Sequence, residues 1–347
     1  NGLARHSSTN SLEVTLTCGL NAEGELNTSD RLVISNNKSR HLVYATDRIT
    51  YKLGYVSFAY NTSGISRVYS DSTTYTDKQL DIDSAGVMTV EGGNINFLAP
   101  IRISQNKGPR GGLLAVTSGE ASLNASSVEE YVDSHNVDES GKGAMFYVGG
   151  SGKLNVTGIN IKDQALTGVG LFYVDKGGEL NLGSTEKETL MYNSHGTTGL
   201  IYVLGTANLI NVRMVSCGTT TSSYGPIYVG GSGVANVTGI STTYTINGST
   251  KYANYGLYGG TITCGLVYDK DGNAVANTVA GGVVNMKGGV ISGDRRPLII
   301  LQQQKVAELM SVTAQHSICF MIVSMVGQLL TVIPLKRVHK FMSGVEF

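Results

Sequence analysis

Pairs of carboxylates are the residues in this sequence with which a protein could hydrolyse a glycosidic bond, because glycosidases hold two carboxyl groups about 5 to 9.5 Å apart. Asp81 and Asp83 alternate in the segment QLDIDS and would share one face of a strand. Further acids lie in one polar stretch: Glu129, Glu130, Asp133, Asp138 and Glu139. We interpret these loop acids as solvated charge. His195, in NSHGTTG, has no Asp-Asp partner and is interpreted as a turn residue.

Glycine-rich turns and paired acids could instead bind a cation. The segment GGSGKLNVT begins like the calcium-binding repeat GGxGxD, but Leu154 and, in a second copy, Ala235 stand where the aspartate would be. Asp269 and Asp271 imitate the start of an EF-hand loop that lacks its final glutamate. The cysteines are far apart, without a CxxC pair: Cys18, Cys217, Cys264 and Cys319. We expect no catalytic residues, no metal and no cofactor, and the disulfide state stays open.

A repeated segment organises the chain around these candidates. Residues Tyr147–Ile159 have the sequence YVGGSGKLNVTGI, and Tyr228–Ile240 have YVGGSGVANVTGI, an offset of 81 residues. Shorter copies lie between them, in the steps of 26, 29 and 26 residues that separate four valines: Val148, Val174, Val203 and Val229. Fainter copies precede them at Val90 and Val116. Similarity at a nearly fixed period is typical of repeat architectures.

Each repeat contains an apolar strand such as FYV, a glycine corner, a second strand such as KLNV, and a polar stretch of variable length. Such a unit suits one turn of a parallel β-helix, in which each strand pairs with its equivalent one coil on, at about 4.8 Å. Alternation would point Phe146 and Val148, and their equivalents in other coils, into the core. The glycine corner would permit positive φ and close approach of the next coil. The variable stretches, such as DSHNVDESGKG and GSTEKETLMYN, would be insertions.

Three segments carry a family resemblance: GGVVNMKGGVISGD, VEGGNINF followed by IRISQN ending at Asn106, and LMYN ending at Asn193. They resemble the GG-apolar-apolar and apolar-x-x-Asn repeats of polymorphic outer-membrane proteins and adhesin-like surface proteins. Those proteins belong to the pectate-lyase-like group, so the resemblance implies a right-handed parallel β-helix, an all-β fold. The family's Phe-x-x-Asn has Ile or Leu at its first position in these segments. Cys217 and Asp294 stand where the asparagine is expected.

The chain divides by composition into three parts. Residues 1–85 contain irregular β segments, which predict degenerate first coils and an N-terminal cap, and residues 86–294 contain the repeats. Residues 295–347 contain few glycines and form a non-repeat tail with helix formers. Within it, residues 317–335 form an uncharged run of 19, followed by basic residues. This run is a membrane anchor, a helix packed on the stack, or a misread terminus.

Binding residues are not identified by the sequence. Tyrosines gather near the N-terminus and could stack on sugars, although packing is the favoured interpretation: Tyr44, Tyr51, Tyr55, Tyr60, Tyr69 and Tyr75. The chain has 26 basic and 26 acidic residues, which argues against a nucleic-acid partner. The repeated strands carry almost no acid or base, which disfavours an active site on their surface. We expect an extracellular or cell-surface adhesin-like or structural protein that binds a glycan or protein ligand. The alternative is a polysaccharide-active lyase or hydrolase. Ligand identity and oligomeric state stay open.

Overall fold

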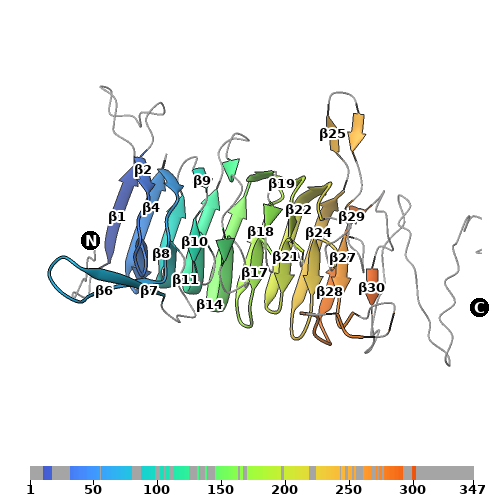
Figure 1. Cartoon of the computed structure of the whole chain (residues 1–347). Helices are drawn as coiled ribbons and strands as arrows, with labels where there is room; N and C mark the ends of the chain where they lie inside the picture. Colours follow the sequence, from blue (N-terminus) through green and yellow to red (C-terminus); the bar gives the residue numbers. More distant parts are fainter. Residues whose placement is uncertain are drawn as a thin grey trace, which may run out of the picture.

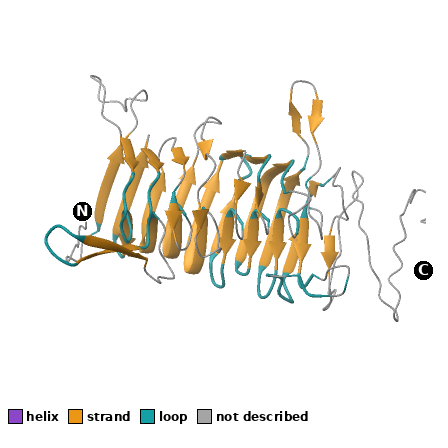
Figure 2. Ribbon diagram, viewed as in Figure 1, coloured by secondary structure: helices purple, strands orange, loops and turns teal. Residues whose placement is uncertain are grey.

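A long parallel sheet dominates the molecule (Figure 1). The structure is a computed structural model, and it describes residues 11–17, 32–54, 56–79, 87–97, 102–104, 106–108, 112–124, 131–132, 137–138, 145–162, 165–166, 170–196, 199–218, 224–242, 244–246, 249–251, 254, 261–267, 271, 273–275, 277–291 and 299–301. Within these residues the regular structure consists of strands, with no helix (Figure 2). The main sheet has 22 strands, and every pair of neighbours in it is parallel, so the chain must cross over between successive strands.

The strands of the main sheet form three rows, in which each strand pairs with its equivalent in the next coil. Row A contains β3 (Val43–Thr46), the first halves of β8 (Met88–Phe97), β11 (Leu114–Asn124) and β14 (Phe146–Thr157), then β17 (Phe172–Val174), β21 (Ile201–Val203), β23 (Ile227–Val229), β27 (Ile262–Cys264) and β30 (Ile299–Leu301). Row B contains β1 (Leu12–Thr17), β4 (Ile49–Gly54), the second halves of β8, β11 and β14, then β18 (Glu179–Leu182), β22 (Thr206–Val215), β24 (Val234–Ser241) and β28 (Val283–Met286).

Row C was not expected from the sequence. It contains β2 (Leu32–Ser35), β5 (Val56–Ala59), β9 (Arg102–Ser104), β12 (Tyr131–Val132), β15 (Asn160–Lys162), β19 (Thr189–Tyr192), the ends of β22 and β24, and β29 (Gly289–Val290). The chain therefore passes from row A to row B to row C in each coil. The segment GSTEKETLMYN, expected as an insertion, ends in β19 of this row. A coil contains three strands rather than two.

Short additional strands lie at the corner between rows C and A. Two small parallel pairs lie there: β10 (Lys107–Gly108) with β13 (Val137–Asp138), and β16 (Ala165–Leu166) with β20 (His195–Gly196). Two antiparallel hairpins leave the stack: β6 (Ile65–Tyr69) with β7 (Tyr75–Gln79), and β25 (Tyr244–Ile246) with β26 (Ser249–Lys251). Figure 1 shows β6 and β7 extending beside the first coils and β25 at the opposite end of the stack.

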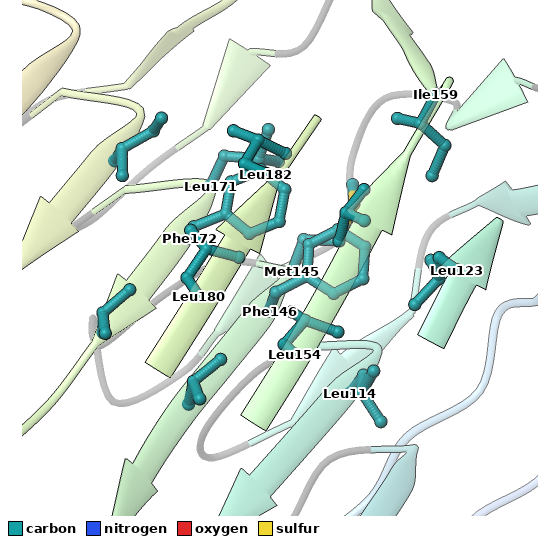
Figure 3. Close-up of a cluster of buried hydrophobic side chains, with 14 of the residues drawn as sticks. Leu114, Leu123, Met145, Phe146, Leu154, Ile159, Leu171, Phe172, Leu180 and Leu182 are labelled. Atoms are coloured by element: carbon teal, nitrogen blue, oxygen red, sulfur yellow. The ribbon is translucent and has the colours of Figure 1, made fainter. Parts of the chain in front are cut away.

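The core is a set of ladders made by equivalent side chains in successive coils, as the alternation predicts. Phe146 and Phe172 are fully buried, and their rings stack with centroids 4.9 Å apart. Val148 and Val174 pair in register and are also fully buried. Figure 3 shows the two phenylalanines near buried leucines, among them Leu154 and Leu180 of row B. Because each ladder is completed by the neighbouring coil, burial depends on stacking rather than on any coil alone.

The glycine corner between rows A and B works as expected. Gly177 has a φ of +79°, and a Cβ built there would lie 2.0 Å from the carbonyl oxygen of Gly150 in the preceding coil. At Gly178 a Cβ would lie 2.5 Å from the carbonyl oxygen of Val148. No side chain fits at these distances, so the backbones of successive coils approach each other only through glycine. These residues are architectural.

A buried polar position follows row C and explains the apolar-x-x-Asn pattern. Asn106 is fully buried, and its Nδ2 donates to the carbonyl oxygen of Phe58 at 3.0 Å, in the preceding coil. Asn61 repeats this bond one coil earlier, donating to Ile34 at 2.8 Å. Residues 58–61 are Phe-Ala-Tyr-Asn, so a Phe-x-x-Asn sequence occurs at this position, in addition to the segments with Ile or Leu.

Two other expectations about this position have different outcomes. Cys217 occupies it as predicted: it is fully buried, and its thiol lies 3.5 Å from the carbonyl oxygen of Met191. The prediction for Asn193 is wrong, because this residue is exposed with a φ of 47°, and the buried Ser194 takes the position instead. The apolar-x-x-Asn pattern ending at Asn193 predicts Leu190 as its first residue, whereas Met191 is the fully buried residue that pairs in register with Met214. Asp294 lies outside the described residues.

The first and last parts of the chain join the same sheet where they are described. Strands β1 and β4 pair in parallel, and β4 pairs in turn with β8. After residue 294, β30 extends row A by pairing with β27. Residues 302–347, including the run 317–335, lie outside the described residues. The described part of the chain contains no helix of the length and hydropathy needed to cross a membrane.

Candidate binding surfaces

The hairpin β6–β7 is the first candidate surface, and its base is fixed to the stack. Gly64 donates its N–H to the carbonyl oxygen of Arg40 at 3.1 Å, and Ile65 donates to Ser39 at 3.1 Å. Its turn is closed by Asp71, whose Oδ1 accepts from the backbone N–H of residues 73 and 74 at 2.8 and 2.6 Å. These bonds lower the pKa of Asp71 to about 2. The hairpin is therefore held at both ends.

The two faces of this hairpin differ. Residues that pair directly across the strands share a face, so Tyr69 with Tyr75 and Arg67 with Asp77 form one face, which we name the tyrosine face. The alternate residues Val68, Thr76, Ser66 and Lys78 form the back face. Tyr69 is 60% exposed and Tyr75 is 45% exposed. Their ring centroids lie 5.7 Å apart at an angle of 57°. Two large rings thus stand in solvent on one side.

Charged groups order the tyrosine face. The carbon at the centre of the Arg67 guanidinium lies 3.8 Å from the centroid of the Tyr75 ring. Its Nε donates to Asp77 at 3.1 Å, and Lys38 of the stack contacts the same carboxylate at 3.1 Å. Hydrogen bonds from Arg67 and then Lys38 hold the pKa of Asp77 below its usual range. Exposed ion pairs add little stability, so their main effect is to position Arg67 over the ring.

A ladder of asparagine amides on the outer face of row B is the second candidate surface. Its members pair in register in successive coils: Asn155, Asn181, Asn208, Asn236 and Asn285. Each Nδ2 donates to the Oδ1 of the preceding coil, at 2.8, 2.7, 2.8 and 2.9 Å along the stack. At the first coil, Asn155 donates to the carboxylate of Glu120 and to Ser122. All amides therefore point the same way, and hydrogen bonds in such chains strengthen one another.

The outer tyrosines of row A are not available to a ligand. Tyr147, Tyr173, Tyr202 and Tyr228 point away from the core yet are at most 7% exposed. Their rings stack at 5.9, 5.0 and 4.8 Å. The hydroxyl of Tyr228 bonds to backbone groups of Gly265 and Val279, in the segment that follows β27. Burial raises the pKa of Tyr228 to about 12. These tyrosines form a second buried cluster, on the face of row A that points away from the main core.

A cluster of titratable side chains lies near the base of the hairpin. The ring of His41 stacks on Tyr44 with centroids 4.5 Å apart, and its Nδ1 lies 2.9 Å from the hydroxyl of Thr89. The Tyr44 hydroxyl donates to the carboxylate of Glu91. Burial is the main cause that lowers the pKa of His41 to about 4 and raises that of Tyr44 to about 12. Both are neutral at pH 7, away from the range that suits acid–base catalysis.

The six tyrosines near the N-terminus, interpreted from the sequence as packing residues, have different environments in the fold. Tyr51 is buried at 8% exposure, as the packing interpretation predicts, and Tyr44 is partly buried against His41. Tyr55 lies outside the described residues. Tyr60 is 54% exposed, and the last two tyrosines form the tyrosine face. The packing interpretation therefore fails for half of the set, and sequence alone gave no signal that separates the two halves.

The acidic candidates are mostly not placed. Those outside the described residues, or without a described side chain, are Asp81, Asp83, Glu129, Glu130, Asp133, Asp138, Glu139 and Asp269. His195 lies in β20 and is partly exposed, and Asp271 is exposed in a turn. Across the described residues, no group of three or more His, Cys, Asp or Glu side chains could hold a metal ion. Cys217 and Cys264 are buried free thiols, and burial raises the pKa of both.

The chain was compared with models of protein families, with curated proteins and with solved structures. None of the three comparisons finds a match.

Proposed function

We propose that this chain is a right-handed parallel β-helix of the adhesin-like or structural kind, which acts at a cell surface or outside the cell by binding a glycan or protein ligand. The succession of rows A, B and C supports the winding, because parallel crossovers within one sheet are overwhelmingly right-handed. The resemblance of its repeats to adhesin-like surface proteins supports the class of function.

The single observation that carries the proposal is the tyrosine face of hairpin β6–β7. Tyr69 and Tyr75 pair across the hairpin and still leave 60% and 45% of their surfaces in water, where a ligand can contact them. Tyrosine supplies a large amphipathic contact area and has few rotatable bonds. A ligand that binds to it therefore costs little side-chain conformational entropy. The bonds at the base and turn hold these rings in place before a ligand arrives.

Binding arrays of glycans and extracellular-matrix proteins test this proposal, with the purified full chain as the probe. The variant Tyr69→Ser with Tyr75→Ser should lose signal for the recognised ligand by about tenfold or more. Val68→Ser is the matched control, because Val68 is 49% exposed on the back face. Equal loss in both variants, or no loss in either, would refute a site on the tyrosine face. Release of reducing or unsaturated sugar from polysaccharides would favour an enzyme.

The run 317–335 gives a separate prediction about location. Its 19 uncharged residues suit a membrane anchor that would hold the coils outside the cell. Full-length chain that stays in the membrane pellet after a carbonate wash would support the anchor, and a soluble chain would remove it.

A further inference from the structure

The tyrosine face carries the guanidinium group of Arg67, whose N–H donors suit an acidic partner. We propose that it binds an acidic saccharide, with a sugar ring against Tyr69 and a carboxylate or sulfate of the sugar on Arg67. This inference rests on the binding function proposed above and names its ligand class. It concerns the hairpin and the neighbouring Lys38, and it does not involve the asparagine ladder.

Arg67 is oriented for an anion. The central carbon of its guanidinium lies 3.8 Å from the centroid of the Tyr75 ring and its Nε donates to Asp77, so a ligand would bind at the terminal nitrogens, beside the hydroxyl of Tyr69. A planar guanidinium can bind a carboxylate or sulfate through two parallel hydrogen bonds, which an ammonium group cannot do. The Arg67 side chain is 38% exposed, so a ligand can reach it. The hydroxyl of Tyr69 lies on the same face and helps raise the pKa of Arg67, after the larger effect of Asp77.

The charge balance of the site also favours an anion. Asp77 is shared by two cations, Arg67 and Lys38, which leaves one positive charge in excess at this group. Lys38 is 56% exposed beside it and adds to the attraction. The whole chain has no net charge, so the excess is local and does not make a general polyanion surface.

A saccharide suits the rings better than an acidic peptide does. The two rings are tilted by 57° and Arg67 lies over Tyr75, so Tyr69 offers a single ring surface and the pair forms no shared apolar groove for side chains. The C–H face of a sugar ring can pack on the ring of a tyrosine. The hydroxyl groups of the sugar can form hydrogen bonds with the tyrosine hydroxyl. A single anion receptor beside such rings matches a sugar that carries one acid group per unit. An acidic peptide remains an outcome of the test.

Calorimetric titration of the full chain with a matched pair of oligosaccharides tests the inference. One ligand is a uronic-acid oligosaccharide, and the other is the same compound with its carboxyl groups reduced to alcohols. The native chain should bind the acidic form about tenfold or more tightly than the reduced form. Arg67→Gln should remove this preference, so that the variant binds the two forms with about equal affinity. Arg67→Lys should retain part of the preference, because charge remains without the planar fork.

Lys78→Gln on the back face is the control for simple loss of a positive charge, and it should change neither affinity by more than about twofold. Circular dichroism of each variant excludes misfolding. Equal affinity for the two oligosaccharides, or an undiminished preference in Arg67→Gln, would overturn the inference. If an acidic peptide or a neutral glycan binds through the tyrosines instead, the inference fails while the proposed function stands. If no ligand depends on the tyrosine face, the proposed function fails as well.

Discussion

Replacing Asn106 with alanine tests whether the buried polar position holds successive coils together. The Asn106 side chain is fully buried between two coils. Its Oδ1 accepts from the backbone N–H of Asn61 at 3.2 Å and from its Nδ2 at 2.9 Å, while its own Nδ2 donates to Phe58 at 3.0 Å. Asn106→Ala therefore leaves the buried backbone N–H of Asn61 without this acceptor, and it removes the hydrogen bond that the Phe58 carbonyl oxygen accepts. The Nδ2 of Asn61 keeps its bond to Ile34.

Each orphaned buried group costs about 1–3 kcal/mol, so the expected loss of unfolding free energy is about 2–5 kcal/mol. Urea unfolding followed by circular dichroism measures the total. Native-state hydrogen exchange shows where the loss occurs, which matters because stacked coils need not unfold in one step. Protection should fall first at residues 58–61 and 102–106, and less in distant coils.

Asn285→Ala is the matched control. The Asn285 side chain is exposed, and its Nδ2 donates a hydrogen bond to the Oδ1 of Asn236 in the outer ladder at 2.9 Å. It should cost less than about 0.5 kcal/mol. The reasoning is refuted if Asn106→Ala costs no more than this control, or if protection falls evenly through the whole stack.

Three further predictions concern other parts of the stack. Phe146→Ala removes a fully buried ring that stacks on Phe172, and it should cost about 3–5 kcal/mol by urea unfolding; a cost below about 1 kcal/mol would contradict the ladder. Gly178→Ala places a Cβ 2.5 Å from a backbone oxygen and should reduce the yield of folded protein, whereas Ser232→Ala, at an exposed corner residue, should not. The pKa of His41 falls from 6.5 to about 4 on folding, so the unfolded chain binds more protons between these values. Stability should therefore decrease as pH falls through this window, and His41→Phe should flatten the dependence of the urea midpoint on pH.

Rows A and B could be predicted because their letters recur. Phe146, Val148 and their equivalents are large, apolar and regularly spaced, and alternation decides which of them point inward. Row C could not be predicted in the same way. Its strands are short, and Thr189–Tyr192 shares no letters with Asn160–Lys162 although the two pair in register. The misalignment of Asn193 followed directly, since a shift of one residue reverses which side chain is buried.

The surfaces depend on contacts that the sequence cannot display. Tyr173 and Tyr69 both lie in short strands, yet one is covered by neighbouring tyrosines and the other stands in solvent. The difference is whether another coil lies beside the strand, which depends on tertiary packing. The contact of Tyr44 with Glu91 joins residues 47 positions apart across an irregular coil, where no repeat fixes the register.

The direction of the ladders has a mechanical consequence. Hydrogen bonds between coils run along the axis of the stack, so tension between its ends loads them directly, and the covalent chain winds around that axis without spanning it. One coil separates Val148 from Val174, which is 26 residues. Released under force, these residues extend by about 90 Å at about 3.5 Å each, compared with about 4.8 Å in the stack. The length that one coil contributes to the molecule would thus increase roughly twentyfold when the coil detaches. A stack held at one end and pulled at the other would therefore unfold and lengthen one coil at a time.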